Sequence, residues 1–165
     1  MRNILLTGFR RTSSEFLVKK ADYQTMILPN DKVLDSQLLL AELELQHYEY
    51  IFSFGQKPNI KDKVYVETAA RNGKNSIPTD FDYNKLLAAL KTEKIAVHIS
   101  NNAGTSFCNE LYWNVLSYIR SRQLKTKMLF LHIPFCKNIT AVEAFFDKIL
   151  RVTLLYNFIN DAPVS

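Results

Sequence analysis

Residues 95–120, IAVHISNNAGTSFCNELYWNVLSYIR, contain a strand, a polar loop and a helix in immediate succession. The run IAVHI at 95–99 is rich in β-branched residues and predicts a buried strand. A polar segment with one glycine follows it, and apolar residues then recur at helical spacing over 105–120. Such a strand–loop–helix unit is the building block of α/β folds, and this one places Cys108 in the first turn of the helix.

The rest of the chain repeats this alternation of strands and helices. Apolar, β-rich runs predict further strands at residues 3–7, 23–28, 50–54, 63–67 and 128–133, and helical spacing predicts helices at 34–46, 81–91 and 139–158. The polar residues 71–79 indicate a loop. We therefore expect one domain over residues 1–165. The expected fold is a three-layer α/β sandwich, whose mostly parallel central sheet has about six strands with helices on both faces.

Composition narrows the function classes. The chain has 165 residues, a net charge of +5 and 47% hydrophobic residues, without a basic block, so we expect no nucleic-acid partner. No apolar run approaches the roughly 20 residues that span a bilayer, and MRNILLTGF is too short for a signal peptide, so no membrane association is expected. Two cysteines without metal-type spacing fit free thiols in a cytoplasmic protein. Phosphate-binding glycine motifs are absent, so no cofactor is expected, and no residues have the spacing of zinc ligands, so no metal is expected.

Two residues of chemically reactive types, Cys108 and His132, lie near the carboxyl ends of predicted strands, at one edge of the expected sheet. In open α/β sheets, ligands bind beyond the carboxyl ends of the strands. Cys108 lies at a helix start, where free N–H groups and the helix dipole stabilise a thiolate, and His132 lies near the end of the strand MLFLHI. A cysteine nucleophile needs a base, and that base needs an orienting group, for which Asp62 and Glu67 are the candidates. The alternative is structural: a small buried cysteine and a strand histidine bonded to backbone.

Several segments resemble pyroglutamyl peptidase I, the pyrrolidone carboxyl peptidase family. NNAGTSFCNELYW resembles the AGT-x-x-CN segment around that family's catalytic cysteine, and FLHIP resembles its F-I-H-I/V-P segment. ILLTGF and FSFGQ resemble its first strand and its central V-G-Q, and the order agrees over residues 3–135. The resemblance implies a compact α/β cysteine peptidase that removes N-terminal pyroglutamate from peptides.

The resemblance also implies roles for individual residues. Cys108 is the implied nucleophile and His132 the implied general base. The segment DKVYVE matches the family's E-R-V-A-I/V-N, which puts Asp62 at the position of the acid, with Glu67 in reserve. Arg71 is the implied oxyanion-stabilising residue.

Four residues are implied to bind the substrate. Phe9 corresponds to an aromatic that packs on the pyroglutamyl ring, and Gln56 to a residue that lines the same pocket. Ser106 and Phe107 fill the two positions between AGT and the cysteine.

The chain also departs from the family pattern. Family members continue G-F-x-P-F-G-G after the first strand, whereas this chain has GFRRTSSEF, and the loop RNGKNSIPTD is short. Two alternatives therefore stay open. One is a related amidase or peptidase with a changed substrate, for which the pair Arg10 and Arg11 favours an acidic compound. The other is a non-catalytic binding protein on the same fold. The expected partner is a peptide or small amide, and assembly into a homo-oligomer is left open.

Overall fold

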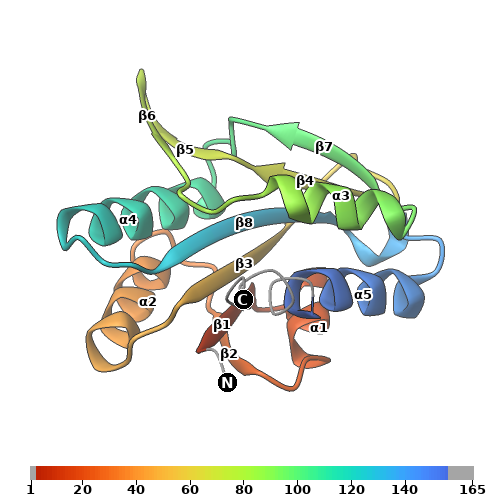
Figure 1. Ribbon diagram of the computed structural model, residues 1–165, viewed down its shortest axis with the longest axis horizontal. Coiled ribbons are helices and arrows are strands. Elements are labelled where there is room, and N and C mark those ends of the chain that lie inside the picture. Colours follow the sequence, from red (N-terminus) through yellow and green to blue (C-terminus); the bar gives the residue numbers. More distant parts are fainter. Residues whose placement is uncertain (1–2, 156–165) are drawn as a thin grey trace, which may run out of the picture.

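A computed structural model describes residues 3–155 and shows a six-stranded sheet between two layers of helices (Figure 1). The strands of this sheet are β1 (Ile4–Phe9), β2 (Gln24–Leu28), β3 (Tyr50–Lys57), β4 (Lys63–Glu67), β7 (Ala96–Ser100) and β8 (Lys127–Pro134). A separate hairpin is formed by β5 (Ala69–Asn72) and β6 (Asn75–Pro78). The helices are α1 (Ser13–Lys19), α2 (Leu34–Leu45), α3 (Asn84–Thr92), α4 (Phe107–Ser121) and α5 (Val142–Leu150), with short turns η1 (Cys136–Asn138) and η2 (Arg151–Leu155).

The strand order in the central sheet is β2-β1-β3-β8-β4-β7. The first four strands are parallel to one another. β4 runs antiparallel to its neighbour β8, while β7 is parallel to β4. The predicted α/β class with a mostly parallel six-stranded sheet is therefore confirmed, but two strands at one side run in the reverse direction.

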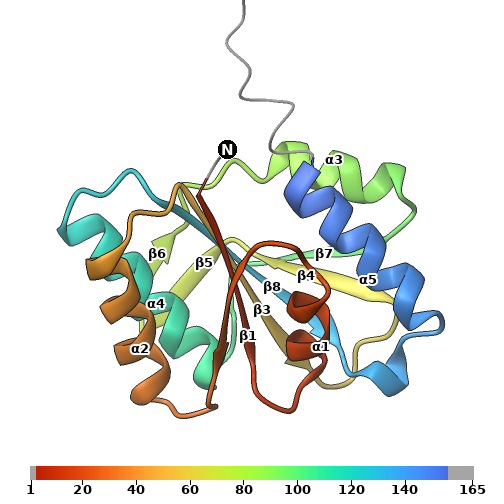
Figure 2. The same cartoon turned by 90° about the horizontal axis from the view of Figure 1, so that it is seen from below.

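Each face of the sheet has its own buried core. One cluster joins the sheet to α1, α3 and α5, and the other joins it to α2 and α4. Figure 2 shows these two helical layers on opposite sides of the strands. Strand β8 serves both, since Leu131 belongs to the first cluster and Phe130 to the second. The alternation of side chains along a strand produces this division.

The sequence prediction missed one helix and one hairpin. α1 has only seven residues, so helical spacing could not reveal it; the side chain of Thr12 caps it by accepting a hydrogen bond from the N–H of Ser14. Residues 71–79, predicted as a loop, contain most of the β5–β6 hairpin, which turns through Gly73 at φ +60°. Polar, exposed strands lack the apolar pattern on which strand prediction depends.

The other predicted elements are found with shifted ends. β3 continues through Gly55 to Lys57 instead of stopping at the glycine. The helix predicted over residues 139–158 begins at Val142 and is α-helical only to Leu150, and residues 156–158 lie outside the described residues. Within residues 3–155, no helix combines the length and apolar character needed to cross a membrane.

Candidate active site

The Cys108 side chain packs against the sheet at Gly55, a residue of β3 that has no side chain. Cys108 lies in the first turn of α4 and is 8% exposed. Its Sγ atom is 2.6 Å from the point that a Cβ atom on Gly55 would occupy, and the Phe130 ring is 3.0 Å from that point. The sulfur therefore fills the space that glycine leaves on β3, and any other residue at position 55 would displace it.

His132 lies on the same face of the sheet, on the neighbouring strand. Gly55 and His132 are register partners in the parallel β3–β8 pair. Paired residues of adjacent strands direct their side chains to the same face, with strands about 4.8 Å apart. The ring of Phe130, which flanks the Cys108 sulfur, is also 5.0 Å from the His132 ring. The two reactive side chains therefore occupy adjacent positions on one face.

Glu67 fixes the orientation of the imidazole. Its Oε1 is 2.8 Å from Nδ1 of His132, and the two side chains are 0% and 3% exposed. Glu67 reaches this point because it pairs with Phe130 in the antiparallel β4–β8 register, two residues from His132 on the same face. With Nδ1 bound to the carboxylate, Nε2 is the nitrogen that can exchange a proton with a reactant.

Asp62 does not contact His132, and its prediction as the orienting acid is wrong. Its carboxylate accepts hydrogen bonds from Thr140, at 2.7 Å from the backbone N–H and 2.6 Å from the hydroxyl. These bonds lower the pKa of Asp62. Tyr65 is the residue opposite His132, and Asp62 precedes the start of β4 at Lys63.

Burial controls the ionisation of the Cys108 thiol. Desolvation raises its pKa to about 12, against a hydrogen bond from the Ser106 side chain that lowers it. The charge of Glu67 raises this pKa further and that of Lys57 lowers it. Desolvation therefore opposes the thiolate that the helix start was expected to stabilise, and a base that removes the thiol proton would assist attack.

Two of the implied substrate-binding residues lie on different faces. Phe9 is buried in the α2/α4 core cluster that also holds Cys108, with its ring centroid 6.4 Å from that of Phe130. Gln56 follows Gly55 in the strand and so points to the other face, where its Oε1 accepts a hydrogen bond from the Ser13 N–H at 3.0 Å. The structure thus brings Phe9, but not the side chain of Gln56, to the Cys108 face.

The remaining predicted residues surround the start of α4. Ser106 is exposed and Phe107 is 41% exposed. Arg71 on β5 donates from Nε to the carbonyl of Asn101 at 2.8 Å. Asn109 accepts a hydrogen bond from the Arg71 N–H at 3.0 Å and donates to the Arg71 carbonyl at 2.8 Å.

Asn109 was not singled out from the sequence, although it is the asparagine that directly follows Cys108 in the CN pair. Its side chain holds the β5 backbone against the first turn of α4. Through Asn109, the β5–β6 hairpin therefore helps to position the helix that carries the thiol.

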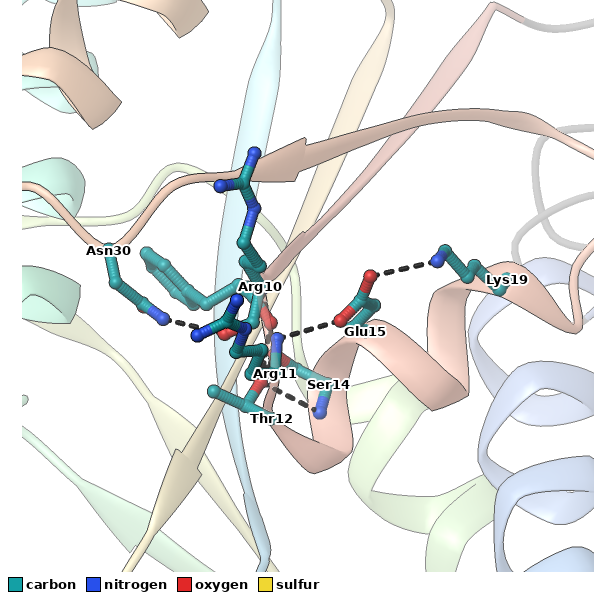
Figure 3. Close-up of polar contacts among 8 residues, drawn as sticks. Arg10, Arg11, Thr12, Ser14, Glu15, Lys19 and Asn30 are labelled. Carbon is teal, nitrogen blue, oxygen red and sulfur yellow. Dashed lines mark hydrogen bonds and ion pairs between the residues drawn. The ribbon is translucent and has the colours of Figure 1, made fainter.

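The segment GFRRTSSEF, which runs from the end of β1 into α1, contains an ordered basic turn (Figure 3). Arg11 has φ 59°, and its N–H donates to Oε2 of Glu15 at 2.7 Å. Lys19 donates to the same carboxylate at 2.8 Å. Asn30, from the loop after β2, donates to the carbonyl of Arg10 at 2.7 Å. These bonds fix the backbone of the turn beside Phe9, and both arginine side chains extend from it.

A thiol at a helix start, a histidine beside it and a buried carboxylate on Nδ1 form the arrangement that cysteine hydrolases use. The family model described as pyroglutamyl peptidase matches residues 58–147, more than half of the chain. The chain belongs to the pyroglutamyl peptidase family.

Curated relatives match part of the chain. The pyrrolidone-carboxylate peptidase 1 of Caldanaerobacter subterraneus is 39% identical over 51 residues, which cover 31% of this chain and 25% of the relative. The pyrrolidone-carboxylate peptidase of Thermosipho africanus is 33% identical over 75 residues, or 46% of this chain and 35% of the relative. The chain thus matches about a quarter to a third of the length of these relatives.

Solved structures show the same fold. Pyroglutamyl peptidase I from Bacillus amyloliquefaciens superposes with a TM-score of 0.80 at 18% identity, covering 93% of this chain and 96% of that one. The pyrrolidone carboxyl peptidase of Fervidobacterium islandicum gives 0.81 at 19% identity, with coverage of 96% and 99%. At this identity the likeness establishes the architecture alone.

Gly55→Ala should destabilise the protein by about 1–3 kcal/mol, because the added methyl group overlaps the Cys108 sulfur and the Phe130 ring. Urea unfolding measures this loss. Adding Cys108→Ala to Gly55→Ala should recover part of it, because the double variant lacks the overlapping sulfur. Strictly additive free energies of unfolding would contradict the close approach of Cys108 to β3.

Alkylation of Cys108 should be slow at neutral pH and should accelerate about tenfold per pH unit from pH 8 to 10, because only the thiolate reacts. The measurement uses iodoacetamide on a Cys136→Ser variant, so that Cys108 is the only thiol. A free cysteine, with an ordinary pKa near 8.5, serves as the reference and levels off in this range. A plateau for Cys108 below pH 8 would show that its pKa is not raised.

Proposed function

We propose that the protein is a cysteine peptidase that removes N-terminal pyroglutamyl residues through a thioester at Cys108. The observation that carries the proposal is the Glu67–His132 pair on the same sheet face as the Cys108 thiol. Family membership and the names of the curated relatives, pyrrolidone-carboxylate peptidases, support the choice of substrate.

In the proposed acylation step, Nε2 of His132 takes the thiol proton as the sulfur attacks the scissile carbonyl carbon. The tetrahedral intermediate collapses to a thioester when His132 returns the proton to the leaving amine. In deacylation, His132 removes a proton from water, the hydroxide attacks the thioester, and the proton restores the thiol as pyroglutamate leaves. Glu67 stabilises the imidazolium formed in each step.

The proposed oxyanion site combines helix N–H groups with Arg71. The first N–H groups of an α-helix have no partner within the helix, and those of α4 begin next to the thiol. Arg71 is anchored through Nε to Asn101, so its two terminal nitrogens are the donors we assign to this role. We propose that Phe9, Ser106 and Phe107 bind the uncharged lactam ring.

A related amidase or peptidase with a changed substrate is the second candidate, favoured by the basic turn after β1. Arg10 and Arg11 extend from a backbone that Glu15 and Asn30 hold in place. An acidic acyl group would find two positive charges there. A purely non-catalytic role has less support, because a binding protein has no need for a buried carboxylate on Nδ1 of His132. Both cysteines are free thiols, which supports the cytoplasm as the proposed location.

A fluorogenic pyroglutamyl amide should be hydrolysed by the wild type and not by Cys108→Ala, because the thioester cannot form without the sulfur. Release of the fluorophore measures turnover. Undiminished turnover by Cys108→Ala would overturn the assignment of the nucleophile. Turnover of acidic acyl amides but not of the pyroglutamyl amide would favour the second candidate.

Glu67→Gln should lower kcat/KM by about 10²–10⁴, because the amide cannot stabilise the imidazolium or select its tautomer. Asp62→Asn should leave kcat/KM within about threefold of the wild type, and should lower the stability slightly through weaker bonds to Thr140. Steady-state kinetics and urea unfolding of both variants make the comparison. The reverse order of kinetic effects would restore Asp62 as the acid.

A further inference from the structure

The sheet face that carries Cys108 continues beyond His132 into a polar row. Position 55 pairs with His132, His132 with Tyr65, and Tyr65 with His98, so these positions form one row across four strands. The rings of Tyr65 and His98 have their centroids 4.5 Å apart. The Cys108 sulfur therefore lies at one end of a row that continues through the base to two further rings.

Lys57 lies next to the row formed by position 55, His132, Tyr65 and His98. It lies two residues after Gly55 on β3 and so faces the same side. Its Nζ atom is 5.5 Å from the centroid of the Tyr65 ring. Its positive charge lowers the pKa of the Cys108 thiol, so the ammonium is within electrostatic reach of the sulfur.

This part of the face is accessible to solvent. Lys57 and Tyr65 are half-buried and His98 is exposed. On the opposite face of β4, the strand that carries Tyr65, Val64 and Val66 are fully buried. A substrate can therefore lie against Tyr65, whereas the other face is closed by packing.

The proposed reaction fixes which part of the substrate lies there. His132 protonates the leaving amine, so the leaving residue must be next to the imidazole, between the sulfur and the open end of the row. If the leaving residue is the last of the peptide, its carboxylate lies only two bonds from that amine. The Lys57 ammonium, which lies over the Tyr65 ring, is a cation within reach of the carboxylate in this geometry.

We propose that Lys57 binds the free carboxylate of the leaving amino acid, and that the enzyme prefers pyroglutamyl dipeptides over dipeptide amides and longer peptides. This inference rests on the function proposed above, and it names the class of substrate for that site. Tyr65 supplies the aromatic surface along which the leaving residue lies. An amide at the same place offers no charge to the ammonium, so it gains less from binding.

The test compares pyroglutamyl-alanine with pyroglutamyl-alanine amide by following the released primary amine. The wild type should show a kcat/KM about tenfold higher for the acid, the usual order for a partly exposed hydrogen bond between charged groups. In Lys57→Met the ratio should fall to about one, and Lys57→Arg should retain most of it. Because the ratio compares two substrates on one protein, it does not depend on the fraction that is folded.

Lys63→Met is the matched control and should keep the wild-type ratio. Lys63 is a half-buried lysine on the same face, two residues before Tyr65. Equal kcat/KM values for acid and amide in the wild type, or an unchanged ratio in Lys57→Met, would overturn the role of Lys57 and leave the peptidase assignment intact. Hydrolysis of neither compound would overturn both.

Discussion

The close approach of α4 to β3 at Gly55 determines the chemistry of this protein. Because residue 55 has no side chain, the Cys108 sulfur occupies the place of a Cβ atom and is buried against the Phe130 ring. The same contact also places the sulfur next to His132, because His132 is the register partner of Gly55 on the neighbouring strand. Burial also raises the pKa of the thiol, so the adjacent imidazole is the base placed to remove its proton. One missing side chain thus positions the nucleophile and also determines how it must be activated.

The direction of β4 decides which carboxylate meets the histidine. In an antiparallel pair, the residue numbers of the two strands run in opposite directions. The end of β4 therefore lies near the middle of β8, and its start lies at the end of β8. Glu67, the last residue of β4, reaches Nδ1 of His132, whereas Asp62 precedes the strand and bonds with Thr140. Distance and burial alone identify Glu67 as the partner of the imidazole, without any appeal to the family resemblance.

Local patterns in the sequence were sufficient for the fold class, and they placed Cys108 and His132 near one end of the sheet, but their roles came from the family resemblance. Apolar runs marked all six strands of the central sheet, since buried strands carry a strong signal. The failures concern properties that no local pattern contains. Strand direction is decided by distant pairing, so the sequence could not decide between Asp62 and Glu67, and the resemblance favoured Asp62. The pKa of Cys108 depends on desolvation by Phe130 and its neighbours, which outweighs the helix-start effect visible in the sequence.

The sheet face that carries Cys108 and His132 is buried on one side of His132 and accessible to solvent on the other. These two environments suit the two parts of the proposed substrate. On one side of His132 the face is closed by α2, α4 and the Phe9 ring, which favours an uncharged acyl group. On the other side it is open and carries Lys57 and His98 around the Tyr65 ring, which favours a charged and hydrated leaving group. In the proposed acylation, a proton passes through His132 from the buried thiol to the amine of the leaving group. The ammonium form of that amine is better solvated on the open side, so release of the leaving group there favours the forward direction of the proposed step.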